Sequence, residues 1–321
     1  MSLPPFFRVE VYMKTLVNTK NLTRAEWLEW RNKGIGGSDV SVIAGINQYK
    51  SIFQLWLEKT GQIVTEEGGT EFTHFGTILE PIVRKEFTRR TGIKVKAKNA
   101  LLQSEEYPFM LANLDGVIYE AGELCIFEAK TASAYKQEIW EQGVPEEYQL
   151  QVQHYMAVTG ARKAYIAALV GGNHFFYHIV YRDEELIRLM INMERKFWEE
   201  HVVQGIEPVP DGSDATTDFL SGKYSKSNGK VVELPEDALE LCIRYEELSE
   251  QLDAIKERKE AVTNQLKYYL KENEVGVVGD RRVTWKQITA TSFDKKRLKT
   301  ENKEIYDAYT TKNEYRRFKV A

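Results

Sequence analysis

The residues best suited to chemistry lie in two neighbouring segments, one with Asp115 and the other with Glu128 and Lys130. If both segments are strands, Glu128 and Lys130 point to one face, because side chains alternate along a strand. Leu124 and Ile126 share that face, which should therefore continue the apolar core. Burying an acid and a lysine there is costly unless the two are paired or hold a metal. Asp115, on the preceding strand, can lie beside them across the hairpin.

A metal site is one interpretation of this cluster. The carboxylates of Asp115 and Glu128, with the carbonyl of Ala129, offer the hard oxygen ligands that Mg²⁺ prefers. Mg²⁺ would serve as Lewis acid and as source of the nucleophile in phosphodiester hydrolysis, and Lys130 would orient or polarise the attacking water. An ordinary ion pair between Glu128 and Lys130 at the end of a strand explains the same residues, because the spacing alone is a weak pattern.

Glu80, Gln151 and Gln153 are further candidates, on predicted helices over 77–91 and 145–158. At about 100° per residue, Glu80 borders the apolar stripe of the first helix, from which its carboxylate could reach a shared metal. Gln151 and Gln153 flank the apolar stripe of the second helix, and their amides could hydrogen-bond a water or a phosphate. Half-exposed acids and glutamines are also common on ordinary helix surfaces.

Arg31 precedes the segment Gly34-Ile-Gly-Gly-Ser38, which predicts a glycine-rich turn that leads into a short helix. Backbone N–H groups at such a helix start favour a phosphate, and Ser38 adds a hydroxyl donor. By itself, the same segment is also typical of an ordinary turn in which Ser38 caps the helix.

The elements that must position these residues alternate between helix and strand. Strands are predicted at 110–119, 123–131, 164–170 and 174–181. Helices are predicted at 38–44, 51–60, 77–91, 145–158 and 183–203. Helices combined with a central, mostly antiparallel sheet predict the α/β (α+β) class.

A segment dominated by Pro, Gly, Ser, Asp and Thr divides the chain. We therefore expect a core domain over 1–206, a linker over 207–230 and a C-terminal extension over 231–321. The extension begins with a long helix to about residue 272, whose apolar residues recur at alternating steps of four and three, as in a coiled coil. A hairpin over 275–288, a basic helix and a strand over 314–320 complete the expected extension.

Composition excludes several classes of protein. With 321 residues, of which 42% are hydrophobic and 29% charged, the chain has the profile of a globular protein. No apolar run is long enough to span a bilayer, and two cysteines are too few for a disulfide framework and fit a reducing cytoplasm. The net charge of −4 hides an asymmetry, because residues 281–319 carry twelve Lys or Arg against five Asp or Glu. That asymmetry suits an enzyme that neutralises phosphates while keeping metal-binding acids, although a solvated surface segment has the same composition.

Five segments, taken in order, resemble the YqaJ-type viral recombinase family, relatives of the phage lambda exonuclease within the PD-(D/E)xK nuclease superfamily. Together they span about residues 22 to 160. One departure is the pair Asn113-Leu114 before Asp115, where the family usually has a proline or a small polar residue. The five segments are Trp30-Arg-Asn-Lys-Gly-Ile-Gly-Gly-Ser-Asp39, Gly76-Thr-Ile-Leu-Glu-Pro81, Leu114-Asp-Gly116, Phe127-Glu-Ala-Lys130 and Tyr148-Gln-Leu-Gln-Val-Gln-His-Tyr155.

The resemblance implies a restriction-endonuclease-like core with a central mixed sheet flanked by helices, followed here by the long C-terminal helix and a small β extension. It implies a Mg²⁺-dependent deoxyribonuclease, an exonuclease that digests one strand of linear double-stranded DNA from 5′ to 3′, with Mn²⁺ as a substitute. The implied partners are DNA ends, a single-strand annealing protein and further copies of the chain in a trimeric ring. The implied place of action is the cytoplasm of a bacterial host, away from membranes.

The resemblance also assigns roles to residues at the implied catalytic centre. Asp115, Glu128 and Glu80 match the metal-binding acids of the family, and Lys130 matches its catalytic lysine. These assignments place the implied cleavage chemistry on two strands and one helix.

Residues on other helices are implied to hold the substrate. Gln153, with Gln151 close behind, matches a glutamine near the scissile phosphate, and Arg31 and Ser38 match residues that hold the terminal 5′-phosphate. The same core also serves structure-specific or restriction-like endonucleases. A DNA-end-binding module with impaired catalysis is a third possibility, against which the retained acids and lysine argue.

Overall fold

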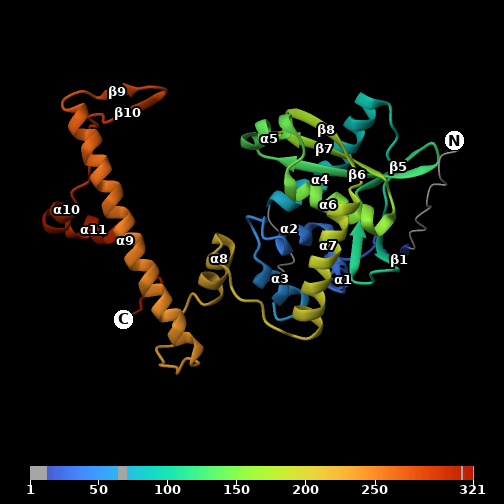
Figure 1. Cartoon of the computed structure of the whole chain (residues 1–321), viewed down its shortest axis with the longest axis horizontal. Coiled ribbons are helices and arrows are strands. Elements are labelled where there is room, and N and C mark those ends of the chain that lie inside the picture. The colour runs from blue at the N-terminus through green and yellow to red at the C-terminus, as the bar shows by residue number, and fades with distance from the viewer. Residues whose placement is uncertain (1–12, 64–70, 312–313, 321) are drawn as a thin grey trace. The chain divides into compact units, whose positions relative to one another are not determined.

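The computed structural model describes residues 13–63, 71–311 and 314–320 and divides the chain into two compact units, Met1–Leu220 and Ser221–Ala321 (Figure 1). The division falls within the segment 207–230 that the sequence predicts as a linker. Part of that segment, Asp214–Lys223, forms helix α8 instead of irregular chain. The domain limits at 206 and 231 stay predictions.

The described part of the first unit contains two four-stranded sheets. Strand order in the first sheet is β1-β3-β4-β2, and in the second it is β5-β6-β7-β8, where β6 and β7 run parallel and the other pairs antiparallel. The strands are β1 Met13–Asn18, β2 Ile35–Gly36, β3 Ala100–Ser104, β4 Met110–Asn113, β5 Gly116–Glu120, β6 Glu123–Ala132, β7 Lys163–Val170 and β8 His174–Tyr181.

Helices flank these sheets, so the expected mixed α/β architecture is confirmed. A 3₁₀ turn, Ala134–Lys136, precedes α5, and a π-helical turn, Phe197–Val203, continues α7. The helices of this unit are α1 Arg24–Arg31, α2 Gly37–Ile43, α3 Ile52–Lys59, α4 Glu71–Thr91, α5 Gln137–Gln142, α6 Glu146–Thr159 and α7 Glu184–Lys196.

The strand predicted over 110–119 is interrupted. β4 ends at Asn113 and β5 begins at Gly116, so Leu114 and Asp115 connect the two sheets. A Cβ on Gly116 would lie 2.6 Å from a methyl of Val95, which is why a glycine follows Asp115 here. The interruption places Asp115 where the sheets meet, instead of inside a continuous ladder.

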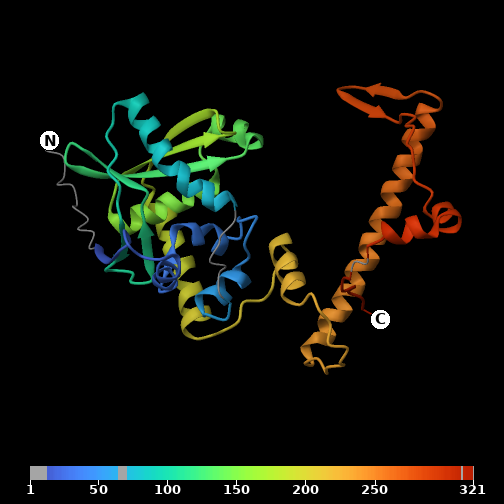
Figure 2. The same cartoon turned by 180° about the vertical axis from the view of Figure 1, so that it is seen from behind.

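Helices α6 and α4 cover opposite faces of the second sheet (Figures 1 and 2). Under α6, Val152 and Met156 pack on Ile126 and Ile166 of the sheet. Phe87 of α4 packs on the other face, in a separate cluster. Burial of such side chains stabilises each layer by roughly 1.5–3 kcal/mol per residue. Because successive side chains of a strand point to opposite faces, β6 contributes apolar side chains to both layers.

His154 and Glu194 form a buried pair that joins α6, α7 and β4. His154 Nδ1 lies 3.0 Å from Glu194 Oε1, and its Nε2 lies 2.9 Å from the carbonyl oxygen of Leu111. Both ring nitrogens face acceptor oxygens, an arrangement that favours the doubly protonated ring. Burial by itself would lower the pKa of His154, but the Glu194 carboxylate and the Leu111 carbonyl raise the pKa above its usual value. This geometry gives His154 a structural role, because its ring connects α6 to both α7 and β4.

Replacing His154 by alanine is expected to lower the free energy of unfolding by about 3–5 kcal/mol, because Glu194 is left as an uncompensated buried charge. The pKa of His154 is raised in the folded state, so the stabilisation is complete below about pH 6.5 and is lost as pH rises through the raised pKa. Urea unfolding of both proteins between pH 6 and pH 9 measures this difference. A difference that grows with pH would contradict the assignment of an imidazolium.

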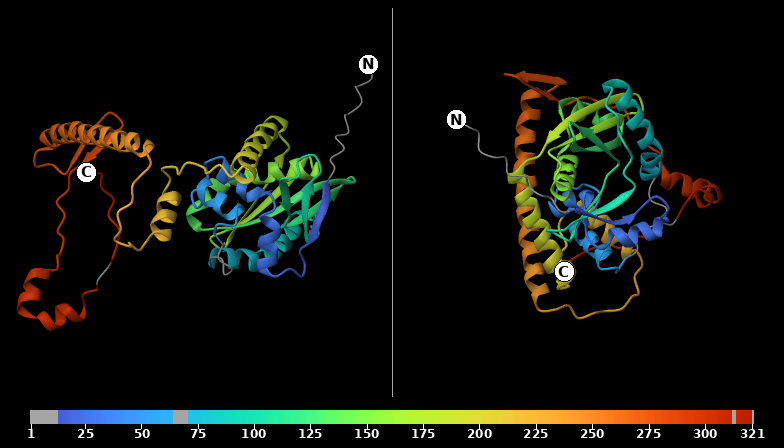
Figure 3. Two further views of the ribbon diagram at one scale, coloured as in Figure 1. Left: turned by 90° about the horizontal axis from the view of Figure 1, so that it is seen from below. Right: turned by 90° about the vertical axis from the view of Figure 1, so that its right-hand side faces the viewer.

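The second unit consists of the long helix α9, Asp237–Leu270, the hairpin β9 Val275–Val278 with β10 Arg281–Thr284, and two short helices, α10 Lys295–Glu301 and α11 Lys303–Ala308 (Figure 3). The predicted long helix and small β extension are therefore confirmed. The strand predicted over 314–320 is wrong, since this segment is irregular. In the described part of the chain, no helix combines the length and apolarity that a membrane span needs.

Candidate active site

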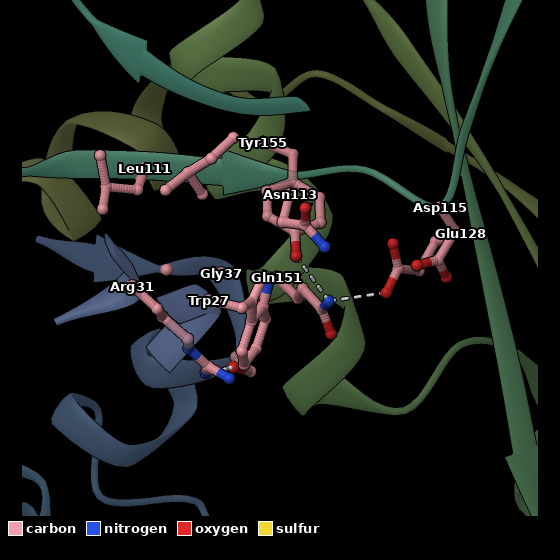
Figure 4. A pocket seen from close by; sticks show the side chains of 12 residues that line it. Trp27, Arg31, Gly37, Leu111, Asn113, Asp115, Glu128, Gln151 and Tyr155 are labelled. Carbon is pink, nitrogen blue, oxygen red and sulfur yellow. Dashed lines mark hydrogen bonds between the residues drawn. The ribbon is translucent and has the colours of Figure 1, made fainter. Parts of the chain in front are cut away.

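One pocket of about 190 Å³ in the first unit joins the two groups of chemically suited residues (Figure 4). Arg31 lies at one end and Asp115 and Glu128 at the other, with Gln151 and Tyr155 of α6 between them. The pocket is lined by Trp27, Arg31, Gly36, Gly37, Ser38, Leu101, Leu111, Asn113, Asp115, Glu128, Gln151 and Tyr155.

Asp115 and Glu128 meet across the β5–β6 hairpin, as the sequence predicts. Gly116 pairs with Phe127, which brings Asp115 beside Glu128 at the end of the ladder. The Ala129 N–H donates to Asp115 Oδ2 at 2.8 Å and fixes this carboxylate against β6. Burial raises the pKa of Asp115 above its usual value, although Lys130 opposes that rise.

Glu128 is 3% exposed, and its two carboxylate oxygens differ. Oε1 accepts hydrogen bonds from Lys130 Nζ and from Gln151 Nε2, both at 2.7 Å. Oε2 is buried and has no partner among the described residues. Burial and the nearby Asp115 raise the pKa of Glu128 to about 8. A buried carboxylate oxygen without a hydrogen-bond donor is available to bind a cation.

Glu80 reaches the same region from α4, which packs on β6. Its Oε1 lies 3.1 Å from Arg84 Nη2, and Arg84 Nη1 donates to the carbonyl oxygen of Asp115 at 3.3 Å. Burial and the charge of Asp115 raise the pKa of Glu80 to about 7. Arg84 therefore joins Glu80 to the Asp115 segment, a role that the sequence patterns did not indicate.

The donor types here fit a hard divalent cation. Asp115 raises the pKa of both Glu80 and Glu128, so the three carboxylates lie close enough to repel one another. A cation would remove that repulsion and displace the bound protons. Within residues 13–63, 71–311 and 314–320, however, no group of three or more His, Cys, Asp or Glu side chains is arranged so that it could hold a metal ion.

Lys130 is held in a fixed position beside the acids. Its ammonium donates to Glu128 Oε1 at 2.7 Å and to Gln151 Oε1 at 2.9 Å, and it lies 4.7 Å from the ring centre of Tyr148. Burial by itself would lower the pKa of Lys130, but Glu128 and Asp115 raise it above the usual value. Lys130 is therefore a charged hydrogen-bond donor and not a proton acceptor.

At the other end of the pocket, Arg31 donates to Ser38 Oγ, and its Nη2 also lies 3.0 Å from Asp39 Oδ1. Behind it, Asp39 Oδ2 lies 2.8 Å from Lys59 Nζ and accepts the Gly36 N–H at 3.0 Å. Lys59 and Arg31 hold the pKa of Asp39 well below its usual range, against the effect of burial. The guanidinium is thus fixed from behind by a buried carboxylate that sequence reasoning did not single out.

Two signals could have found this support. Asp39 is the third residue of α2, where an acid commonly accepts the N–H of the capping residue, here Gly36. Lys59 stands at the end of α3 among apolar residues, and its side chain is 2% exposed. A buried lysine needs a charged partner, but only the packing of α3 against α2 identifies it.

Gly37 permits the close approach of α2 to α6 that forms the middle of the pocket. A Cβ on Gly37 would lie 2.6 Å from Tyr155 Cε1 and 2.9 Å from Gln151 Cγ. Gln151 Nε2 also donates to the Tyr155 hydroxyl at 3.0 Å, so both side chains are fixed where α2 meets them. A side chain at position 37 would therefore displace Tyr155 and Gln151.

Gln153, which the resemblance places near the scissile phosphate, is not among the residues that line the pocket. Its Nε2 donates to the carbonyl oxygen of Tyr181 at 2.8 Å, and its Oε1 accepts the Asp183 N–H at 3.0 Å. Two residues along a helix differ by about 200° in direction, so Gln151 and Gln153 point to opposite sides of α6. Gln151 lines the pocket, whereas Gln153 joins the end of β8 to the start of α7.

Comparisons with known proteins agree on one family. Residues 26–162 match the profile of the YqaJ-like viral recombinase domain. The chain is 40% identical over 311 residues to the uncharacterized protein YqaJ of Bacillus subtilis (strain 168), covering 96% of this chain and 97% of that protein.

Solved structures of two exonucleases are also similar in part. The alkaline exonuclease LHK-Exo of Laribacter hongkongensis matches 56% of this chain and 93% of its own, with 22% identity and a TM-score of 0.48. A phage-related exonuclease of Haemophilus somnus 129PT matches 56% of this chain and 99% of its own, with 16% identity and a TM-score of 0.41.

Proposed function

The chain belongs to the YqaJ-like viral recombinase family, and we propose that it is a deoxyribonuclease that digests one strand of linear duplex DNA from its 5′ end with the aid of Mg²⁺. One observation carries this proposal. A single pocket holds the Arg31 guanidinium with the Ser38 hydroxyl beside it at one end and the carboxylates of Asp115 and Glu128, the latter bonded to Lys130, at the other. That arrangement suits a terminal phosphate at the first end and a phosphodiester at the second.

At the reacting end, a bound divalent cation would polarise the scissile phosphate and lower the pKa of a water. Asp115, Glu128 and Glu80 are the proposed ligands, and Mn²⁺ should substitute because it accepts the same oxygen donors. Lys130 orients the water and donates to the negative charge that develops on the phosphate. Gln151 fixes the positions of Lys130 and Glu128, because its side-chain amide hydrogen-bonds to both.

At the anchoring end, Arg31 offers a planar pair of donors to a terminal phosphate, and Ser38 adds its hydroxyl. Asp39 and Lys59 orient Arg31 without reaching the pocket themselves. An anchor at a fixed distance from the cleavage site makes the enzyme act from an end. Closed circular DNA has no terminal phosphate to occupy this anchor, so it should resist cleavage.

Arg31→Ala should slow digestion of 5′-phosphorylated duplexes about ten- to a hundredfold, because removing charge-assisted hydrogen bonds costs about 1.5–3 kcal/mol. The advantage of 5′-phosphorylated over 5′-hydroxyl ends should largely disappear. Arg31→Lys should recover only part of the rate, since it keeps the charge but loses the fork. Rates on both kinds of end measure this effect, and an unchanged preference in Arg31→Ala would place the phosphate elsewhere.

Asp39→Asn should reduce the same 5′-phosphate preference by about tenfold, because Arg31 loses the charged partner that fixes it. KM for phosphorylated ends should rise while kcat on 5′-hydroxyl ends stays near that of the wild type. Steady-state kinetics on the two substrates measure these changes in KM and kcat separately. An equal loss of activity on both kinds of end would mean that Asp39 contributes only to the stability of the fold.

The family resemblance supplies the proposed setting of this activity. The product of such digestion is single-stranded DNA, so a single-strand annealing protein is the natural partner. We also propose a trimeric ring and action in the cytoplasm of a bacterial host. Sedimentation of the full chain tests the trimer.

A further inference from the structure

Helix α9 carries an apolar seam, interrupted only at Lys259, that nothing in the proposed nuclease function uses. The seam follows heptad positions a and d over residues 241–269. All its apolar members are exposed, by 40 to 79%. Two of them have aromatic neighbours within the unit, since Tyr245 packs against Phe318 and Tyr269 against Tyr268. The members are Leu241, Tyr245, Leu248, Leu252, Ile255, Val262, Leu266 and Tyr269.

The charges of α9 are separated around this seam. Lys259 occupies the one a position that is not apolar, and Arg244 and Arg258 occupy flanking g positions. None of these three cations has an ion pair within the described chain. All acids of the same stretch lie on the outer b, c and f positions, where Asp253 pairs with Lys256 and Glu260 with Lys267. The outer acids are Glu246, Glu247, Glu250, Asp253, Glu257 and Glu260.

This pattern disfavours a second copy of the chain as the occupant of the seam. Positions a, d, e and g between 241 and 269 contain no Asp or Glu, so a second α9 brings no acid to the interface in any register or direction. Lys259 would enter an apolar layer without a partner, which costs stability. A helix with apolar a and d residues and acidic flanks instead pairs with each of the three cations.

We propose that the α9 seam is the docking site for an amphipathic helix of another protein, with Asp or Glu at its flanking positions. Burial of apolar side chains along four heptads supplies the affinity. The cations Arg244, Arg258 and Lys259 favour a partner helix that carries negative charge. The site is separate from the nuclease pocket and goes beyond the proposed activity.

Two matched helical peptides of 28 residues test the proposal on the full chain. Both carry Leu and Ile at a and d, one with Glu and the other with Lys at every e and g. Fluorescence anisotropy should show binding of the Glu peptide, weakened by salt, and at least about tenfold weaker binding of the Lys peptide. The variant R244E/R258E/K259E should reverse this preference, and Leu252→Glu should abolish binding of both.

Equal affinity for the two peptides, or no binding of the Glu peptide, would overturn the proposal. So would a fall in the sedimentation mass of the protein alone on Leu252→Glu, because the seam would then hold a second copy. Digestion of linear duplexes by the same variants should match the wild type. A variant that no longer binds the peptide but digests DNA normally would show an effect on the seam alone. If the wild-type protein itself does not digest DNA, the proposed nuclease function fails, and the docking proposal is tested separately by peptide binding.

Discussion

Replacing Lys130 by alanine is expected to abolish strand cleavage while DNA and metal binding remain largely intact. Lys130 is the one side chain of the cluster that donates to both Glu128 and Gln151. In the proposed reaction its charge orients the water and meets the charge that develops on the phosphate, a contribution made mainly in the transition state. Removal of one preorganised donor to the developing charge lowers kcat by about 10²–10³-fold.

Single-turnover digestion of a 5′-phosphorylated duplex by Lys130→Ala, next to DNA binding by anisotropy, measures the two effects separately. Lys130→Arg tests the geometry, because the planar guanidinium keeps the charge but cannot occupy the position between Glu128 and Gln151. Tyr148→Phe is the matched control, since the ring over Lys130 is kept. Turnover like that of wild type in Lys130→Ala would remove Lys130 from the mechanism.

Asp115→Asn and Glu128→Gln should each weaken binding of Mg²⁺ or Mn²⁺ by more than about 100-fold and leave the enzyme inactive. Loss of a residue that merely supports a metal ligand already costs 10–100-fold, so loss of a ligand should cost more. The amide in Asp115→Asn can still accept the Ala129 N–H, and Glu128→Gln keeps the shape of the side chain. Effects on folding are therefore small, and the missing charge is what the experiment isolates.

Calorimetric titration with Mn²⁺ gives the affinities directly. Glu120→Gln is the matched control, because this carboxylate belongs to the same hairpin but bonds to Lys163 and Tyr165 outside the pocket. It should bind metal as the wild type does. Undiminished affinity in both Asp115→Asn and Glu128→Gln would mean that the cation has other ligands.

The sequence by itself determined the parts of the site that depend on local periodicity. Glu128 and Lys130 share a face because side chains alternate along a strand, whatever packs on it. Asp115 lies beside them because a hairpin fixes which residues pair. The glycine signals likewise placed Ser38 in the first turn of α2, close in sequence to Arg31 at the end of α1, although the cap of α2 is Gly36 and not Ser38. These relations join residues close together in sequence, so short-range geometry suffices.

Tertiary packing decided which helix faces and which distant partners complete the site. Gln151 faces the pocket and Gln153 does not, because the contacts of α6 with the sheet fix its rotation. Lys59 supports Asp39 because α3 packs beside α2, which no pattern within either helix specifies. The phosphate anchor and the carboxylates form one pocket because Gly37 lets α2 approach α6. Such relations depend on how preformed elements dock, and docking is set by the shape of the whole core.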